Sequence, residues 1–303
     1  MKSVKILYNQ NKLCNEISSD AFYANECSEF SIRLVFSGFE QYHLGKRELN
    51  IYPGNFLVIN EGTTYSRKIY SDIASNTFSI LYSSNFLRNF HSNIILSDEH
   101  LLDDPFNLTQ IEGPAFLETI YPFKGHMKYN LLHLRNHFND NAIEDLLLDE
   151  YMYHSLLLFY QLYNQEIISK SSQLNISNNK TRIEIFKRLS IAKDFIISNY
   201  NQDITLDDIS NSACLSAPHL FRTFKQTFNC SPHQYLMQIR LRNASHLLKT
   251  TDYSLNEIVN MVGLTCTSTF IKIFKNKFCL TPRHYRINQE IQLGQENSFR
   301  YSA

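Results

Sequence analysis

Basic side chains recur at matching places in the last third of the chain, and their chemistry is hydrogen bonding to anions and to nucleic-acid bases. Arg222 and Lys225 lie in one segment, and Lys272 and Lys275 lie in a similar segment further on. A guanidinium group can donate two parallel hydrogen bonds to the edge of a guanine, whereas an ammonium group suits a phosphate. These residues predict a binding surface rather than a catalytic centre.

The usual signatures of catalysis are missing from the sequence. It contains no nucleophile elbow, no phosphate-binding loop and no dinucleotide fingerprint. His43 has no histidine two residues away, so the His-x-His metal site of some β-barrels is not expected. His133 and His137 lack the intervening acid of a zinc protease helix, and six scattered cysteines indicate reduced thiols. We therefore expect no catalytic residue, no metal and no cofactor.

An internal repeat surrounds the basic residues. Thr205-Leu-Asp-Asp-Ile aligns with Ser254-Leu-Asn-Glu-Ile at an offset of 49, as Ala213-Cys-Leu-Ser does with Val262-Gly-Leu-Thr. Phe224-Lys-Gln-Thr-Phe aligns with Phe274-Lys-Asn-Lys-Phe at an offset of 50, so one residue is inserted in the second copy's turn. Each copy predicts a helix, a tight turn and a second helix, which is the motif that places a helix in a DNA major groove.

Helix-start signals support this interpretation. An acid follows Thr205 and Ser254 by three positions, which predicts a reciprocal capping box at each first helix. Caps for the second helices are Ser216 in the first copy and Thr265 or Thr267 in the second. Apolar residues spaced four apart are expected to face the first helix of each copy: Leu220 and Phe224, and Phe270 and Phe274.

A longer helix is expected between the two copies. Residues 232–249 carry an apolar stripe, and about 18 helical residues span roughly 27 Å. Major-groove segments on one side of B-DNA recur about every 34 Å. A rigid spacer of this size suits two helices that enter successive major-groove segments. Arg240 and Arg242 on the spacer are expected to have structural or positional roles and need not touch a base.

The charge is divided between two parts of the chain. Residues 1–179 hold 13 lysines and arginines against 20 aspartates and glutamates, a net charge of −7, and residues 180–290 hold 15 against 8, a net charge of +7. The formal net charge of zero hides this division. A basic region beside an acidic one is typical of a module that meets phosphate.

The amino-terminal half reads as a small antiparallel barrel with helices after it. Short alternating runs between about residues 20 and 84 are punctuated by glycine and proline, and helical periods follow over about 127–165. Aromatic residues in the strands suggest a pocket for a small apolar or sugar-like molecule, with plain core packing as the alternative: Phe36, Tyr42, Tyr52, Phe56, Tyr65 and Phe78.

The helix over 145–165 is apolar on more than one face, which suggests that it also contacts a second subunit. The residues expected in that dimer contact are Leu148, Tyr151, Met152, Leu156 and Phe159. The alternative is that this helix belongs only to the core of its own domain.

The domain boundaries follow from these patterns: a sensor and dimerisation domain over 1–166, a polar linker over 167–181, a helical domain over 182–290 and a flexible tail over 291–303. No apolar run reaches the roughly 18 residues of a membrane span, and the start of the chain lacks a secretory signal. These features predict a cytoplasmic protein without a membrane partner.

Residues 182–286 resemble the DNA-binding domain of the AraC/XylS family of bacterial transcription regulators. The resemblance rests on Ile204-Thr-Leu-Asp-Asp-Ile, His219-Leu-Phe-Arg-Thr-Phe-Lys, Ile239-Arg-Leu-Arg-Asn-Ala, Gly263-Leu264 and Thr281-Pro282. The segment Leu49-Asn-Ile-Tyr-Pro-Gly-Asn-Phe is similar to that family's cupin-like sensor. The resemblance implies a cupin-like antiparallel β-barrel with flanking helices, followed by an all-α domain with two helix-turn-helix units over about 204–228 and 254–278.

The resemblance also implies which residues read DNA. The family layout makes Ala217 to Phe228 and Cys266 to Phe278 the recognition helices, with the groove-facing positions Ala217, Pro218, Phe221, Arg222, Lys225, Thr267, Ser268, Ile271, Lys272 and Lys275. Phe221 either meets thymine methyl groups or packs on the neighbouring helix. We expect the first copy to carry more of the specificity, because its set has the stronger hydrogen-bonding group.

This chain differs from the usual family sequence at the last turn of each copy. A glycine is usual where Asn229 and Cys279 stand, and asparagine tolerates a positive φ better than cysteine. The implied partners are double-stranded DNA, RNA polymerase, a small effector and a second copy of the chain, and the implied activity is transcription activation. The alternatives are a constitutive DNA binder without a ligand and a cupin metalloenzyme fused to a DNA-binding module.

Overall fold

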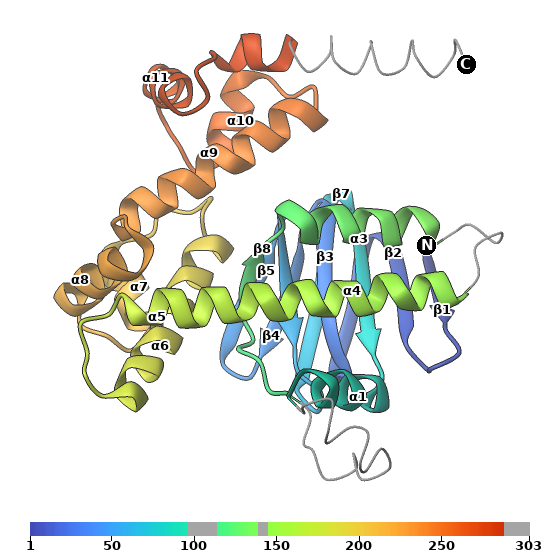
Figure 1. The fold of residues 1–303 in the computed structure, drawn as a ribbon. Helices are drawn as coiled ribbons and strands as arrows, with labels where there is room; N and C mark the ends of the chain where they lie inside the picture. Colours follow the sequence, from blue (N-terminus) through green and yellow to red (C-terminus); the bar gives the residue numbers. More distant parts are fainter. Residues whose placement is uncertain (96–113, 139–144, 288–303) are drawn as a thin grey trace. The chain divides into compact units, whose positions relative to one another are not determined.

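The computed structural model describes residues 1–95, 114–138 and 145–287, and it divides the chain into two compact regions (Figure 1). The N-terminal region comprises Met1–Ser198, and the C-terminal region begins at Asn199. The predicted tail over 291–303 lies outside the described residues.

The N-terminal region is built on one antiparallel sheet of eight strands within the described residues. The sheet order is β1-β2-β7-β3-β6-β8, and the hairpin of β4 and β5 joins it through β7. The bounds are β1 Lys2–Ile6, β2 Lys12–Cys27, β3 Phe30–Ser37, β4 Glu40–Leu44, β5 Arg47–Ile51, β6 Asn55–Ile59, β7 Thr64–Tyr82 and β8 Ile120–Pro122.

The two longest strands close the sheet into a barrel. The second half of β7 pairs with β3, whereas its first half pairs with β4. Strand β2 follows β7 along both halves, with register shifts between Ser18 and Asp20 and between Tyr23 and Glu26. Such irregularities bend a strand, so the β2–β7 pair can run through both halves of the barrel, the half with β3 and the half with β4. The predicted barrel start near residue 20 was wrong, because β1 and the first half of β2 precede it. The many polar residues of these strands hide the strand pattern.

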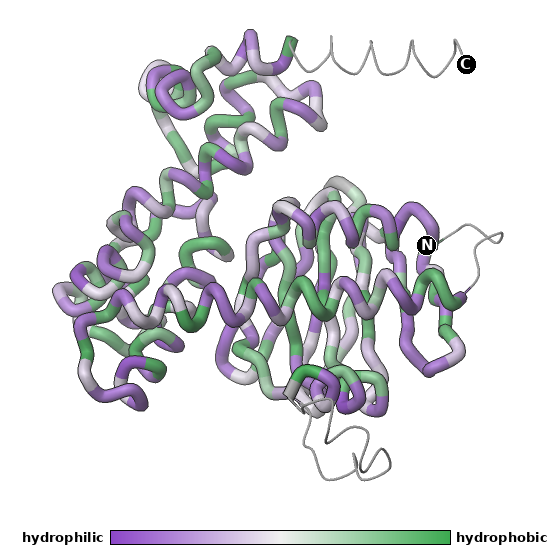
Figure 2. The backbone as a smooth tube through the Cα atoms, viewed as in Figure 1, coloured by the Kyte–Doolittle hydropathy of each residue, from purple (hydrophilic) through white to green (hydrophobic). Residues whose placement is uncertain are grey.

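The apolar core lies on the outer face of β3, β6 and β7, under helices α1 (Ser84–Ile95), α3 (Gly125–His137) and α4 (Asp145–Asn164). Alternate strand residues such as Phe30, Ile32 and Leu34 face these helices. Hydrophobic and hydrophilic residues accordingly alternate along α4 (Figure 2).

This core changes the interpretation of the predicted dimer contact. Leu148, Met152, Leu156 and Phe159 are 0% exposed within a single copy of the chain. They therefore have no surface with which to meet a second subunit, and the alternative, a core helix of its own domain, describes them. Tyr151 is half-buried and stacks on His133 and His137.

Helical structure continues into the segment predicted as a linker. After α4 come a π-helix over Gln165–Ser169, the short α5 (Lys170–Ser172) and then α6 (Asn179–Ser198). Helix α6 packs on β5. Its buried Asp194 accepts hydrogen bonds from the Thr119 hydroxyl at 2.7 Å and the Ile120 amide at 3.0 Å, and it pairs with Arg47 at 2.7 Å. Lys193 beside it donates to the Ile120 carbonyl at 2.8 Å.

The C-terminal region contains the two predicted helix-turn-helix units. The first is α7 (Leu206–Ser212) and α8 (Ala217–Phe228), and the second is α10 (Leu255–Met261) and α11 (Thr267–Phe278). The spacer between them, α9 (Pro232–Thr250), has 19 residues and is therefore about 28 Å long. The fold class predicted from the sequence, a flanked antiparallel barrel followed by an all-helical region with two such units, is confirmed.

The local helix signals agree with the structure at most positions. Both capping boxes are present, at Thr205 with Asp208 and at Ser254 with Glu257. The inserted residue lies in the second turn, which has one residue more than the first. The predicted cap of α11 was wrong, since Cys266 stands at that position instead of Thr265 or Thr267.

Candidate functional site

Helix α8 presents its polar and basic residues on the face opposite its buried one. Leu220 and Phe224 are 0% exposed and form the inner face, as expected from their spacing. Pro218, Arg222 and Lys225 are exposed, and Ala217 is half-buried. Phe221 leaves 44% of its surface exposed, so it does not pack fully on the neighbouring helix. The structure therefore brings the predicted groove-facing residues of the first unit onto one accessible face.

Helix α11 repeats this arrangement with weaker groups. Phe270 and Phe274 form the buried face, and Ser268, Lys272 and Lys275 are exposed. Ile271 and Thr267 are half-buried. The Thr267 hydroxyl already donates to the Asn256 side chain of α10 at 2.9 Å, so part of its hydrogen-bonding capacity is used inside the unit.

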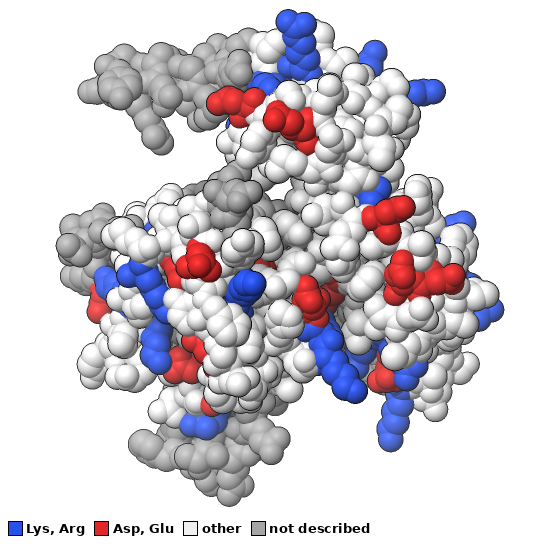
Figure 3. All heavy atoms as spheres, turned by 180° about the vertical axis from the view of Figure 1, so that it is seen from behind, with Lys and Arg blue, Asp and Glu red and all other residues white. Residues whose placement is uncertain are grey.

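The charges of the four basic residues on these faces are available to bind an external anion. Within the described part of the chain, none of Arg222, Lys225, Lys272 and Lys275 forms an ion pair with a carboxylate. On the face seen in Figure 3, lysine and arginine side chains project as separate groups rather than as one continuous patch. Separate, unpaired charges on helices are suited to individual phosphates and base edges.

A thiol at the start of α11 was missed by the sequence analysis. Cys266 is exposed, and its sulfur lies 3.2 Å from the hydroxyls of Ser268 and Thr269. These hydrogen bonds, that of Ser268 first, lower the pKa of Cys266 to about 7. A cysteine directly before a helix was the available signal, but threonines on either side looked like the better caps.

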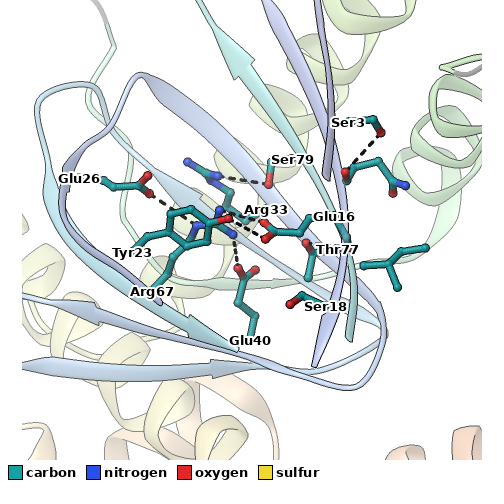
Figure 4. Close-up of polar contacts among 12 residues, drawn as sticks. Ser3, Glu16, Ser18, Tyr23, Glu26, Arg33, Glu40, Arg67, Thr77 and Ser79 are labelled. Carbon is teal, nitrogen blue, oxygen red and sulfur yellow. Dashed lines mark hydrogen bonds and ion pairs between the residues drawn. The ribbon is translucent and has the colours of Figure 1, made fainter. Parts of the chain in front are cut away.

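A polar network occupies part of the barrel interior, beside buried apolar and aromatic residues such as Leu57, Ile59 and Tyr42 (Figure 4). Residues that alternate with the outer apolar ones point inward, among them Arg33 of β3 and Arg67 of β7. Arg67 pairs with Glu40 at 2.7 Å, Glu16 at 3.0 Å and Glu26 at 3.5 Å.

Arg33 has a different environment from Arg67. It is 5% exposed, and its guanidinium group donates to three hydroxyls: Ser31 at 3.1 Å, Ser79 at 3.2 Å and Tyr65 at 2.8 Å. Burial raises the pKa of Tyr65 to about 12, so its hydroxyl stays protonated at neutral pH. The interior thus offers both charged donors and charged acceptors together with neutral hydroxyls.

The six residues predicted for the effector pocket do not lie together. Tyr42 and Tyr65 meet at 5.8 Å inside the barrel, and the Tyr42 hydroxyl donates to Glu40 at 2.8 Å. Phe36, Phe56 and Phe78 belong to the outer core under the helices, and Tyr52 stacks on Phe39. Period-two alternation identified two faces of each strand but not which face the helices would cover.

Within residues 1–95, 114–138 and 145–287, no three or more histidine, cysteine or acidic side chains gather as a metal site would require. His133 and His137 stack with each other at 6.0 Å and with Tyr151. No helix in the same residues has both the length and the apolar character needed to cross a membrane.

Comparisons with known proteins agree with the geometry of the C-terminal region. A family model described as a helix-turn-helix domain matches residues 209–288. The lactose operon transcription activator of Staphylococcus xylosus is 31% identical over 153 residues, which cover 50% of this chain and 51% of that protein. The chain thus matches about half the length of that relative.

Two further similarities concern shorter proteins. The probable transcription factor PqrA of Proteus vulgaris is 36% identical over 88 residues, which are 29% of this chain and 72% of that protein. The solved C-terminal domain of the two-component response regulator yesN from Fusobacterium nucleatum is 33% identical, covers 31% of this chain and 93% of that domain, and has a TM-score of 0.30. With its two helix-turn-helix units and these relatives, the chain belongs to the AraC/XylS family of transcriptional regulators.

Proposed function

We propose that this protein regulates transcription by binding a specific duplex DNA sequence with both helix-turn-helix units. The observation that carries the proposal is the pair of exposed polar faces on α8 and α11, with Arg222 and Lys225 on one and Lys272 and Lys275 on the other. Each face lies on the second helix of its unit, which is the helix that enters a major groove in this motif.

The spacer supports engagement of two groove segments at once. Helix α9 is about 28 Å long, and successive major-groove segments on one side of the duplex are about 34 Å apart. The contact residues we propose are those expected from the sequence, and their side chains are exposed or half-buried on α8 and α11.

Selection of random duplex DNA by the purified full-length chain tests this proposal. We expect an enriched sequence with two protected segments about one helical turn apart. Selection of no sequence at moderate salt would contradict the proposal, as would a footprint of only one segment.

We further propose that the first unit contributes more specificity than the second. Arg222 can donate two hydrogen bonds to guanine, whereas Thr267 is partly engaged by Asn256. Substituting the selected site base by base measures the contribution of each half. A larger loss of affinity from changes in the α11 half would contradict this assignment.

The N-terminal region is proposed to bind a small effector inside the barrel. Of the two classes expected from the sequence, the polar network inside the barrel favours the sugar-like one, because ligand hydroxyls can replace hydrogen bonds that Arg33, Tyr65 and Glu40 now form with neighbouring side chains. The relative from Staphylococcus xylosus is named for a lactose operon, which is consistent with this class. The metalloenzyme alternative gains no support, since the interior groups resemble no metal-ligand set among the described residues.

Thermal unfolding of the full chain with a panel of sugars and other metabolites tests the effector proposal. A ligand of the folded state raises the unfolding temperature in proportion to its concentration relative to its Kd. If no compound in a broad panel changes the unfolding temperature or the DNA affinity, the alternative of a constitutive DNA binder is favoured.

Activation through contact with RNA polymerase, action in the cytoplasm and assembly as a homodimer complete the proposal. A dimer would have to use surfaces other than Leu148, Met152, Leu156 and Phe159, which are buried. Light scattering of the purified chain reports the oligomeric state, and transcription from a template carrying the selected site reports activation.

A further inference from the structure

The loop before the first helix-turn-helix unit is held from two sides by parts of the chain that follow it. This loop, residues 199–203, leads into the cap of α7 at Thr205. One contact comes from Arg240 on the spacer α9, and the other comes from Gly263 in the turn between α10 and α11. The loop therefore touches both the spacer and the second unit.

Arg240 binds the loop through its backbone. Its Nε donates to the Tyr200 carbonyl at 2.8 Å, and its Nη2 donates to the Gln202 carbonyl at 2.7 Å. The residue is only 8% exposed. A buried guanidinium group with two backbone acceptors fixes both position and angle, because its donors lie in one rigid plane. By contrast, Arg242 on the same helix is exposed.

Gly263 touches the same loop from the second unit. A Cβ added to this residue would lie 2.7 Å from the Asn201 carbonyl oxygen and 2.8 Å from the carbonyl carbon. Those atoms belong to the backbone, so they cannot move aside by a change of rotamer. Any side chain at position 263 would push the turn of the second unit away from the loop.

The first copy of the repeat shows that the backbone conformation of this turn does not by itself require a glycine. Cys214 aligns with Gly263, has a φ of 51° and carries a side chain there. Gly263 has a φ of 73°. Since the same turn accommodates a side chain in the first copy, close approach to Asn201 is the feature that distinguishes the glycine in the second.

We propose that residues 199–203 are a brace that sets the placement of α11 relative to α8, with Arg240 and Gly263 as its positioning residues. The brace determines which spacing between two DNA segments the protein accepts. This inference rests on the proposed function, because it assumes that both units bind one duplex. Neither positioning residue has to touch the DNA.

The test measures affinity for the selected duplex and for versions with one or two base pairs inserted or removed between the two segments. The wild-type chain should prefer the selected spacing strongly. Gly263→Ala, which displaces the turn, and Arg240→Met, which releases the loop, should each weaken binding at that spacing about tenfold or more, because the second segment is no longer engaged in the same geometry. Both should also flatten or shift the spacing preference.

Matched controls are Cys214→Ala at the equivalent turn position and Arg242→Met on the same helix, and both should retain the wild-type spacing preference. The unfolding temperature of each variant is measured in parallel. Arg240→Lys provides a conservative variant in case Gly263→Ala does not fold, and it should give a loss smaller than that of Arg240→Met.

The outcomes distinguish the two proposals. If the wild-type chain selects no two-segment site, the proposed function fails and the brace fails with it. If the wild type binds as proposed but the folded variants at 240 and 263 keep an unchanged spacing profile, the brace alone is overturned. If these residues only stabilise the fold, their replacement lowers the fraction of folded protein and weakens binding equally at every spacing. An equal loss at every spacing would therefore also overturn the brace.

Discussion

Arg222 lies exposed on the outer face of α8, carries two parallel donors, and forms no ion pair with a carboxylate of residues 1–95, 114–138 or 145–287. No residue on the outer face of α11 matches it, since Lys272 and Lys275 are point charges and Ser268 is a short hydroxyl. Both units can therefore attract phosphates, but the first unit has the better group for distinguishing one base from another.

Replacement of Arg222 tests this difference. We expect Arg222→Ala to weaken binding to the selected duplex by about 1–3 kcal/mol, the usual contribution of a bidentate contact with a base. Arg222→Lys keeps the charge but loses the planar fork, so it should relax discrimination at one base pair while non-specific binding is retained. Titration of labelled duplexes measures both. Equal behaviour of the lysine variant and the wild type would indicate a phosphate contact instead.

The last residue of each recognition helix is followed by a left-handed residue, Asn229 with a φ of 58° and Cys279 with a φ of 61°. Cysteine is strained in this conformation, whereas asparagine tolerates it. We expect Cys279→Gly to raise the free energy of unfolding of the C-terminal region by about 1 kcal/mol. Urea unfolding checks this value. Asn229→Gly is the matched control and should change stability less; an equal gain would contradict the assignment of strain to Cys279.

Among the secondary-structure elements, α6 is attached to the barrel by buried charges. Asp194 is fully buried and is paired with Arg47 of β5, whose side chain is 27% exposed. Burial raises the pKa of Asp194 above its ordinary value, while Lys193 and Arg47 act in the opposite direction. The docking of α6 on β5 therefore depends on neutralising a carboxylate that is costly to bury.

Removing the partner of Asp194 should loosen this element. We expect Arg47→Met to lower the free energy of unfolding of the N-terminal region by about 2 kcal/mol, less than for a fully buried pair because Arg47 is partly exposed. The double variant with Asp194→Asn should lose less than the sum of the single losses, because no buried carboxylate is left without its Arg47 partner. Urea unfolding of the four proteins gives this cycle, and additive losses would show that the pair is not coupled.

The same pair predicts a pH dependence. The folded state holds a proton on Asp194 more tightly than the unfolded state, so this group's contribution to stability is full below the unfolded pKa and is lost as pH rises through the folded pKa. Without Arg47 the folded pKa rises further. The loss caused by Arg47→Met should thus be larger near pH 7 than at about pH 4. If Arg47→Met lowers the free energy of unfolding by the same amount at both pH values, the loss comes from packing rather than from the charge of Asp194.

The elements that could be predicted were those with local signals. The capping boxes and the apolar pairs at Leu220 and Phe270 involve residues within one or two helical turns of each other, and the repeat is visible by aligning two segments of the sequence directly. The barrel interior could not be predicted in the same way, because Ile32 and Arg33 alternate on a strand whose covering helices come from residues far along the chain. The strand β8 has three residues and was too short to show a period.

For the whole molecule, the division of charge has a measurable effect on DNA binding. Residues 180–290 carry a net charge of +7 in a chain whose formal net charge is zero. If the two units together neutralise about six phosphates, affinity should fall about 10³-fold between roughly 50 and 200 mM salt. Lys275→Ala should reduce the slope of log K against log salt by about 1. A slope near zero would show that phosphate contacts contribute little.

The two recognition helices descend from one duplicated segment but present different side chains, and their turns differ in length by one residue. The DNA sequence that one copy of this chain recognises should accordingly be, within itself, neither a tandem repeat nor a palindrome. A genome scan that assumes either symmetry within the segment bound by one copy would miss its binding sites, whereas a scan with an asymmetric matrix, oriented by strand, would find them.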